Sequence, residues 1–456
     1  GYAYEDGRMS YVTRLNYDYS QKYLLEATFR WDASARFNED NRWGFFPGFL
    51  AGWRISEEEF MKSAEFVDNL KLRISRGNAG NDNTSQYNFL TGYKYGGQYA
   101  LGDPTAMYQG IVSTGLANPN ITWENTVTNN IGLDASLWQG KLSIELDVFK
   151  RKVTGVLATR IESLPSTFGA TLPDENINSY DNRGFELRLG HKNTVGEFNY
   201  SVDGNVSWAR GKWIHYEEPV FIDEESRARL QYSGQWMNRF FGYEALGYFN
   251  SQEEIDNWTV NQDLNDVPNK TIKPGDIKYL DYNKDGILDD KDKHVIGRGY
   301  TPEVMFGLNF IASYKGFDFS MLWQGATNFN TYFDKEAQVS FYNGENILAS
   351  FENHWTPENL NAKYPRLTYG SVANNIHTST FWLQDATYLR LKNLQLGYTI
   401  PKQWVEKANI ENIRIFLSGY NLLTFDNVTP FDPEANGSGW YYPQQKSISA
   451  GLNLTF

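Results

Sequence analysis

The chain alternates apolar and polar side chains over many segments of about ten residues. In Tyr23–Asp32 (YLLEATFRWD) the odd positions are apolar or aromatic, and the even positions after Leu24 are Glu, Thr, Arg and Asp. Leu142–Val148 (LSIELDV), Phe198–Trp208 and Ser447–Phe456 show the same alternation. Successive side chains of a β-strand point to opposite faces, so each segment predicts a strand with one apolar and one polar face.

Such strands fit either a soluble sandwich or a transmembrane barrel. A sandwich buries the apolar face between two sheets, whereas a barrel turns it to lipid and keeps the polar face toward a wet interior. Sandwich strands are usually about five or six residues long, so the observed length favours the barrel. Aromatic residues near strand ends are typical of the interfacial girdles of such barrels. We therefore expect an all-β, transmembrane, antiparallel β-barrel fold.

Thirteen long strands are expected, and the connections between them alternate in length. The predicted strands are 8–19, 22–34, 44–55, 68–78, 123–138, 141–157, 180–191, 197–210, 303–314, 317–332, 386–400, 411–424 and 445–456. Turns such as 19–22 and 314–317 are short, while the segments 79–121, 210–302 and 332–386 are long. Short periplasmic turns and long extracellular loops are the arrangement of outer-membrane barrels.

An odd number of strands predicts a piece of a larger barrel, because single-chain bacterial barrels have an even number. An open edge in lipid would leave backbone groups unpaired, so we expect further strands to complete the structure. The first residues already read as strand, with no basic segment followed by an apolar one, and no signal peptide is expected. The medium-length turn at Ser56–Phe66 predicts a periplasmic helix, with Phe60 packing back on the barrel.

Composition excludes several classes of function. The 456 residues carry a net charge of -13, which disfavours nucleic acid as a partner because phosphate neutralisation requires clustered Lys and Arg. There is no Cys, so disulfides and thiolate zinc sites are excluded. Neither a phosphate-binding glycine loop nor a nucleophile elbow is present, and we expect no enzyme. Five histidines lack metal-ligand spacing: His191, His215, His294, His354 and His377.

The segment Asp281–Asp292 (DYNKDGILDDKD) predicts a calcium-binding loop. Oxygen ligands at alternate positions allow the backbone to wrap one Ca²⁺, and Gly286 occupies the sixth position, where the sharp turn is needed. The expected ligands are Asp281, Asn283, Asp285, the carbonyl of Ile287, Asp289 and Asp292. Position twelve is usually Glu, so Asp292 predicts weaker coordination. A polar turn that binds no metal is the alternative. We expect a structural role within a long extracellular loop at 211–302.

Aromatic residues in the predicted long loops are candidates for stacking on sugar rings. These residues are Trp43, Trp258, Trp355, Trp382, Trp440, Tyr441 and Tyr442. The alternative for each ring is packing within the loops or against a partner protein.

Several blocks of sequence resemble the SusC/RagA branch of TonB-dependent outer-membrane transporters. They are Arg14–Phe37, Trp43–Phe60, Leu70–Asn81, the segments GDIKYLDYNKDGILDDKDKHVIG and YKGFDFSMLWQG, Leu389–Pro401 and Ser418–Phe425. The resemblance covers nearly the whole chain. It implies that 1–456 is the C-terminal part of a 22-stranded barrel in the bacterial outer membrane, with the plug domain absent from this chain.

The same resemblance implies the function and the partners. The expected function is TonB-energised import of oligosaccharides, or of peptides in some members, together with a SusD-like surface lipoprotein. TonB would act through a plug outside this chain, and membrane lipid would surround the strands. A passive porin and a soluble glycan-binding β domain are the alternatives.

Overall fold

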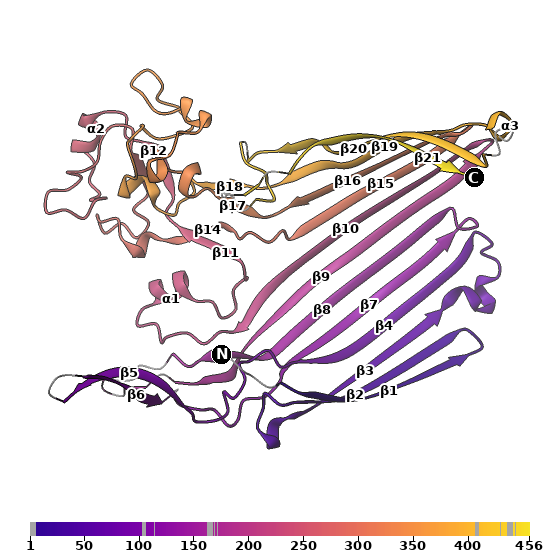
Figure 1. Ribbon diagram of the computed structural model, residues 1–456, viewed down its shortest axis with the longest axis horizontal. Coiled ribbons are helices and arrows are strands. Elements are labelled where there is room, and N and C mark those ends of the chain that lie inside the picture. Colours follow the sequence, from indigo (N-terminus) through magenta and orange to yellow (C-terminus); the bar gives the residue numbers. More distant parts are fainter. Residues whose placement is uncertain are drawn as a thin grey trace. The chain divides into compact units, whose positions relative to one another are not determined.

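The computed structural model describes residues 6–102, 106–113, 115–161, 167, 169–170, 172–405, 410–428, 430–435, 441–442 and 444–456. Thirteen strands form one sheet in the order β1-β2-β3-β4-β7-β8-β9-β10-β15-β16-β19-β20-β21 (Figure 1). Their bounds are Arg8–Tyr19, Tyr23–Ser34, Trp43–Arg54, Val67–Asn81, Glu124–Leu137, Leu142–Thr159, Asp174–Val195, Phe198–His215, Val304–Tyr314, Phe317–Thr327, Tyr388–Thr399, Asn412–Asp426 and Ser447–Thr455. Each of the thirteen predicted strands is present.

The remaining elements lie in the connections. The short strands are β5 (Tyr93–Leu101), β6 (Ala106–Ser113), β11 (Arg239–Gly242), β12 (Ala245–Tyr248), β13 (Ile277–Tyr279), β14 (His294–Arg298), β17 (Asn330–Tyr332) and β18 (Leu383–Asp385). The helices are α1 (Glu224–Leu230), α2 (Gln252–Asp256) and α3 (Lys402–Val405), with 3₁₀ turns η1 (Glu39–Asn41), η2 (Ile55–Glu57), η3 (Glu59–Met61), η5 (Asp290–Asp292), η6 (Lys335–Ala337), η7 (Tyr342–Gly344), η8 (Ala349–Glu352) and η9 (Ala373–Ile376). None of the helices in the described ranges is long and apolar enough to cross a membrane.

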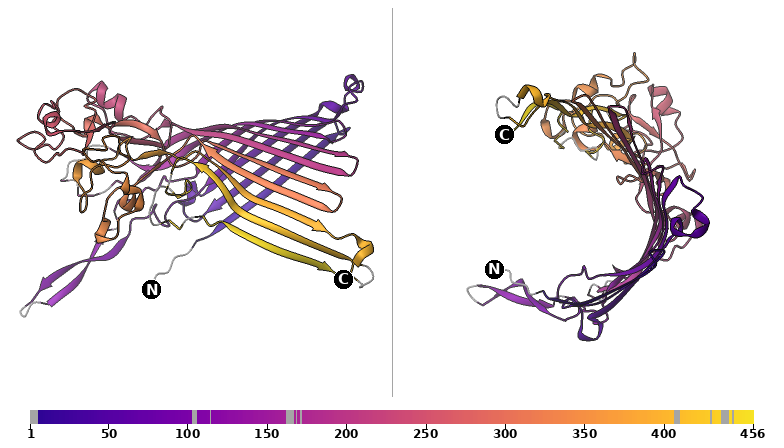
Figure 2. Two further views of the ribbon diagram at one scale, coloured as in Figure 1. Left: turned by 90° about the horizontal axis from the view of Figure 1, so that it is seen from above. Right: turned by 90° about the vertical axis from the view of Figure 1, so that its right-hand side faces the viewer.

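The chain forms two compact units. Unit 1 consists of Gly1–Glu186, Ala209–Ile222 and Gln231–Met237, and unit 2 of Leu187–Trp208, Asp223–Leu230 and Asn238–Phe456. In unit 1, β1 to β4, β7 and β8 lie side by side (Figure 1). The β5–β6 hairpin of the same unit projects beyond them (Figure 2).

Strand register in unit 1 produces the two faces that the alternation predicts. One row across six strands is Tyr17, Leu25, Ala51, Ile74, Ile131 and Val148. The row beside it on the opposite face is Asp18, Leu24, Gly52, Arg73, Gly132 and Asp147. Leu25, Ile74, Ile131 and Val148 are each more than half exposed. The apolar face is therefore not buried between stacked sheets, which rules against the sandwich.

Unit 2 repeats this arrangement in its five long strands. Ala312, Phe319, Leu396, Leu417 and Ala450 form one apolar row, and Ile311, Ser320, Gln395, Ser418 and Ser449 lie in the neighbouring row. The β15–β16 turn has only two residues, Lys315 and Gly316, with φ of 47° and 85°. Positive φ at both positions matches the twist of the flanking strands, which explains the tight connection.

Four predictions about the connections need correction. The segment 79–121 contains the β5–β6 hairpin, which the alternation did not reveal. The expected helix at Ser56–Phe66 is instead two 3₁₀ turns, η2 and η3, and Phe60 is 65% exposed rather than packed on the barrel. Strand β16 ends at Thr327 rather than at residue 332, because Asn328 takes a left-handed φ of 61°. Strand β10 continues to His215, so the long loop begins later than residue 211.

Candidate functional site

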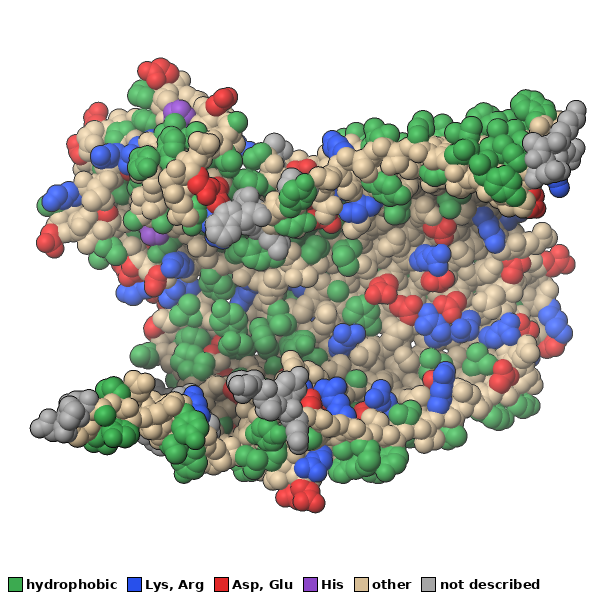
Figure 3. Space-filling view, in the orientation of Figure 1, with side chains coloured by type: hydrophobic (Ala, Val, Ile, Leu, Met, Phe, Trp, Pro, Cys, Tyr) green, Lys and Arg blue, Asp and Glu red, His purple; other side chains and the backbone are tan. Residues whose placement is uncertain are grey.

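The polar face of unit 1 carries a network of ion pairs that spans three strands. Arg73 on β4 donates to both oxygens of Asp134 on β7, at 2.9 and 2.7 Å, and to Asp147 on β8 at 3.0 Å. Lys71 lies 3.1 Å from Asp134, and Asn130 donates to Asp147 at 2.6 Å. Figure 3 looks onto this face, where basic and acidic side chains lie next to one another. Such a surface is suited to water and polar solutes.

A glycine on the middle strand leaves the space that this network needs. A Cβ at Gly132 would lie 2.6 Å from the Arg73 guanidinium carbon and 2.6 Å from an Asp147 oxygen. Unit 2 has the same arrangement, since a Cβ at Gly397 would lie 2.5 Å from Asp318 and 2.6 Å from Arg414. Arg414 Nε donates to Asp318 at 2.9 Å. Sequence alternation identified the polar face, but it could not identify these partners because pairing depends on register.

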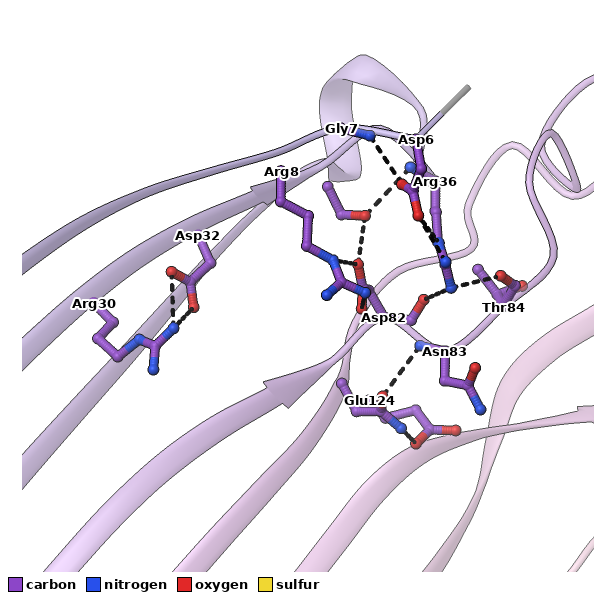
Figure 4. Close-up of polar contacts among 12 residues, drawn as sticks. Asp6, Gly7, Arg8, Arg30, Asp32, Arg36, Asp82, Asn83, Thr84 and Glu124 are labelled. Atoms are coloured by element: carbon purple, nitrogen blue, oxygen red, sulfur yellow. Dashed lines mark hydrogen bonds and ion pairs between the residues drawn. The ribbon is translucent and has the colours of Figure 1, made fainter. Parts of the chain in front are cut away.

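At the long-loop ends of β1, β2 and β4, the buried carboxylate of Asp82 joins three segments (Figure 4). Arg8 donates to it through Nε and Nη2 at 2.8 and 2.7 Å, and Ser34 donates at 2.7 Å. Arg36 donates to the backbone carbonyl of Asp82 at 3.3 Å and pairs with Asp6 at 2.7 Å. These bonds hold the start of the loop after β4 against the first hairpin.

In unit 2 the long connections pack into one body, here called the loop body. Its core is made of buried residues from 243–288, 326–388 and 428, among them Tyr279, Phe333, Tyr364, Trp382 and Val428. The buried pair Asn374 and Asn375 links two of these segments. Asn375 donates to Asp276 at 2.8 Å and accepts from the backbone of Ile277 at 2.9 Å. The loop body is therefore an ordered structure with its own apolar core.

The structure separates the aromatic candidates into different environments. Trp382 is 1% exposed and Trp355 is 7% exposed, and their indole N–H groups donate to the Asn375 carbonyl and to the Asn250 side chain. Trp258 is half-buried, with its ring 5.7 Å from that of Phe249. These three rings belong to the loop body, and Trp355 and Trp382 do not present a face to solvent.

The other aromatic candidates lie elsewhere. Trp43 was predicted to lie in a loop, but it is the first residue of β3. Its ring stacks on that of Tyr11, with 6.0 Å between the ring centres. It therefore extends the apolar face. Trp440 lies outside the described residues. Tyr441 and Tyr442 are 41% and 75% exposed, so Tyr442 is the most exposed ring among the described members of the predicted set.

The predicted calcium loop folds around the carboxylate of Asp281. That carboxylate accepts from the backbone N–H groups of Lys284, Asp285 and Gly286 at 2.6, 3.2 and 2.8 Å. Gly286 takes a φ of 84°, which is the left-handed turn expected at the sixth position. Ile287 forms a β-bridge with Asn261, whose backbone N–H donates to the Gly286 carbonyl at 2.9 Å. Leu288 is buried in the core of the loop body, so the loop is anchored to that core.

The other candidate ligands are held partly by the loop itself. Asn283 donates to Asp285 at 2.9 Å, and this hydrogen bond lowers the pKa of Asp285. Asp292 is fully buried, accepts from the N–H groups of Tyr282 and Asp289 at 2.8 Å, and has its pKa raised by burial. The candidate metal ligands all offer oxygen atoms, which Ca²⁺ prefers. Across the described part of the chain, however, no three His, Asp or Glu side chains gather closely enough to hold a metal by themselves.

Known proteins share this sequence and fold. The chain is 32% identical to TonB-dependent receptor P26 of Formosa agariphila, over 98% of the chain and 46% of the receptor. It is 26% identical to SusC of Bacteroides thetaiotaomicron, over 100% of the chain and 44% of that protein. No family model matches. The chain thus spans less than half the length of these relatives.

The fold agrees with the relationship that the sequence indicates. The solved RagAB peptide importer in its open-open state superimposes with a TM-score of 0.77 at 22% identity, over 98% of this chain and 47% of that chain. The closed-closed state gives 0.76 at 23% identity. The relatives are receptors and transporters rather than enzymes. The chain is therefore a SusC-like relative of the TonB-dependent receptors, and its long strands form part of an outer-membrane β-barrel.

Proposed function

We propose that the chain contributes barrel strands to an importer that carries oligosaccharide nutrients across the outer membrane. The observation that carries this proposal is the polar face with its network of ion pairs around Arg73, opposite a mainly apolar face. Lipid contacts the apolar side of a barrel strand, so the polar side lines a water-filled interior through which a hydrophilic solute can pass.

Energy coupling is part of the proposal. The relatives are named TonB-dependent receptors and are more than twice the length that this chain matches. We assign the plug, the remaining strands and the contact with TonB to the part of the protein beyond these 456 residues. A passive porin, in contrast, would need no energy source.

A surface lipoprotein of the SusD type is the proposed partner. The long loops are extracellular in such barrels. The loop body exposes apolar side chains that a protein partner could cover, including Leu264 and Val267 at 61% and 60% exposure and Tyr369 at 85%. The exposed rings of Tyr441 and Tyr442 are the proposed contacts with sugar.

The experiment is uptake by cells that express the full-length transporter and its lipoprotein. Labelled oligosaccharides and peptides are supplied separately, with and without functional TonB. The proposal expects TonB-dependent uptake of oligosaccharide, recovered chemically unchanged. Peptide uptake instead would support the second candidate, which rests on the description of RagAB as a peptide importer. Uptake that persists without TonB would indicate a porin, and cleavage of the substrate would indicate an enzyme.

We also propose that Asp281–Asp292 binds Ca²⁺ through Asp281, Asn283, Asp285, Asp289, Asp292 and the Ile287 carbonyl. The metal would fix the loop in place and take part in no chemical step. Weak extracellular sites bind calcium at roughly 10⁻⁴–10⁻³ M. At ten to a hundred times Kd, bound calcium stabilises the folded state by about 1.4 to 2.7 kcal/mol.

Calcium binding is tested by thermal unfolding of the purified transporter, with 10 mM calcium or with chelator. The expected result is a higher melting temperature of the loop body with calcium, which Asp281→Asn abolishes. The matched control is Asp266→Asn, a nearby exposed carboxylate outside the loop. Equal melting temperatures with calcium and with chelator would contradict the proposal.

A further inference from the structure

The apolar face of unit 1 is hollowed by a groove of about 790 Å³. We call it the outer groove. Its apolar lining includes Leu15, Leu25, Phe49, Ile74, Ile131 and Val148, all of which are more than half exposed. The volume lies within the range of about 300–1,000 Å³ that is typical of small-molecule sites.

Two adjacent rows of the sheet explain the shape of the outer groove. Ala27 lies between Leu15 and Phe49 in one row, and Ala51 lies between Leu25 and Ile74 in the next. A methyl side chain beside longer ones leaves a depression along the sheet. The depression runs over β2 and β3 and is walled by apolar side chains, so it suits a hydrocarbon chain.

One of these rows changes from apolar to basic. The row of Leu15, Ala27 and Phe49 continues across the next three strands as Arg76, Asn129 and Lys150, which also line the groove. Barrel strands are tilted by about 35–45°, so positions in one row lie at different depths in the membrane. Arg76, Asn129 and Lys150 each lie one row closer to the long loops than Ile74, Ile131 and Val148.

The basic residues of this row are oriented by neighbouring groups. Arg76 donates to the side-chain oxygen of Asn129 at 3.4 Å. Lys150 is 56% exposed and lies 3.3 Å from Asp181, which also pairs with Arg183 at 2.6 Å. Adjacent strands are about 4.8 Å apart, so Arg76 and Lys150, two strands from each other, can reach one anion between them.

Three further cations of unit 1 surround one tryptophan ring. The guanidinium groups of Arg183 and Arg210 lie 5.7 and 4.5 Å from the ring centre of Trp236, and Lys212 lies 5.8 Å from it. The carboxylate of Asp181 pairs with both Lys150 and Arg183, so one negative charge faces two cations there.

We propose that the outer groove and its basic rim bind a phosphorylated lipid of the outer leaflet. An acyl chain lies over Ala27 and Ala51, and the phosphate is held by Arg76, Asn129 and Lys150. The rim is on the long-loop side of the apolar face, which is the level of the outer-leaflet headgroups. Arg forms strong charge-assisted hydrogen bonds with phosphate, and basic pockets at this depth are typical of headgroup recognition.

The test is a binding titration with the full-length transporter purified from outer membranes in mild detergent. The probe is lipid A with two phosphates, and native mass spectrometry measures its binding. Arg76→Gln combined with Lys150→Gln is expected to weaken binding at least tenfold, because hydrogen bonds to a charged group contribute about 1.5–3 kcal/mol each. Ala51→Phe fills the groove and is expected to weaken binding without changing the charge.

Matched controls lie on the same strands. Arg151→Gln changes a residue that is adjacent to Lys150 but faces the polar side. Ala135→Phe enlarges a residue of the apolar face that lies outside the groove. Both should bind lipid A normally, and all variants should unfold at the same temperature. Unchanged binding in the double variant and in Ala51→Phe would overturn the proposal. Equal affinity for phosphatidylcholine, or for inorganic phosphate, would overturn it as well. Neither result bears on import, which uses the other face of the sheet.

Discussion

Gly132 lies between Arg73 and Asp147, and Gly397 lies between Asp318 and Arg414. Each Arg meets its Asp across the strand that carries the glycine. In both places the missing side chain gives the guanidinium a route to its carboxylate over the middle strand. Buried or half-buried charges are tolerated when they are paired, and the pairing here needs a strand that carries no Cβ. The polar face therefore depends on small residues as much as on charged ones.

Gly132→Val is expected to displace Arg73 from Asp134 and Asp147 and to lower the free energy of unfolding by about 1–3 kcal/mol. The measurement is denaturant unfolding of the detergent-solubilised transporter. Gly77→Val is the matched control, because a Cβ at Gly77 on the neighbouring strand meets no atom within 4 Å. Equal destabilisation by the two substitutions would show that the ion pairs do not depend on Gly132.

His377 is expected to make the stability of the loop body depend on pH. Burial lowers the pKa of His377, and the Lys293 cation lowers it further against the opposite effect of Asp290. The rings of Tyr243 and Tyr279 lie 5.1 and 5.6 Å from it. The unfolded chain binds this proton near pH 6.5, at a higher pH than the folded protein does. Stability is therefore complete above about pH 6.5 and falls as the pH drops toward the folded pKa.

The expected result is a lower denaturation midpoint for the loop body at pH 5.5 than at pH 7.5. Tryptophan fluorescence measures the unfolding. His377→Gln should reduce this difference. His215→Gln, an exposed histidine with 54% of its side chain accessible, should keep it. A pH dependence that is the same in all three proteins would contradict the assignment to His377.

At the scale of elements, the loop body behaves as a small domain formed by three separate connections. Trp382 is buried in the core of the loop body, where its ring lies 6.2 Å from that of Tyr364 and its indole N–H donates to the Asn375 carbonyl. Because the ring is buried, its role is packing, and the candidates for ligand contact are the exposed Tyr441 and Tyr442.

Trp382→Ala is expected to destabilise the loop body by about 3–5 kcal/mol, the usual result of removing a buried aromatic ring. Hydrogen exchange of segments 243–288 and 326–388 measures the local change. Tyr369→Ala removes a ring that is 85% exposed and should leave exchange unchanged. Similar protection in the Trp382 variant and the parent would mean that this core does not hold the loops together.

The sequence predicted the strands well and the loops poorly, for a physical reason. Alternation along Leu142–Val148 is local and needs only the two faces of a strand. The short strands β11 to β14 pair with segments tens of residues away, and Asn375 contacts Asp276 about a hundred residues earlier in the chain, which no local pattern encodes. Trp355 and Trp382 were expected in loops, which is confirmed, but their burial follows from tertiary packing.

The calcium loop shows the same division. The position and turn of Gly286 were predicted from the spacing of the acidic residues, and the structure has the expected left-handed φ. The burial of Asp292, and its three backbone donors, could not be predicted from that spacing. Calcium binding itself stays a prediction.

At the scale of the whole molecule, the thirteen long strands of the sheet have one mainly apolar and one mainly polar face. The relatives and the RagAB fold place such strands in the outer membrane. The proposals on transport and on the outer groove rest on the same claim. Side chains such as Leu146 and Val148 face lipid, while their neighbours Glu145 and Asp147 face water.

Nitroxide scanning of β8 tests this claim most directly. The described chain has no Cys, so single cysteines can be placed at each position from Ser143 to Phe149 in the full-length transporter, freed of other cysteines and reconstituted in lipid. Collision rates with oxygen should peak at 144, 146 and 148, and those with a water-soluble nickel complex at 143, 145 and 147. Oxygen and nickel profiles without a period of two, or with the opposite phase, would contradict the account.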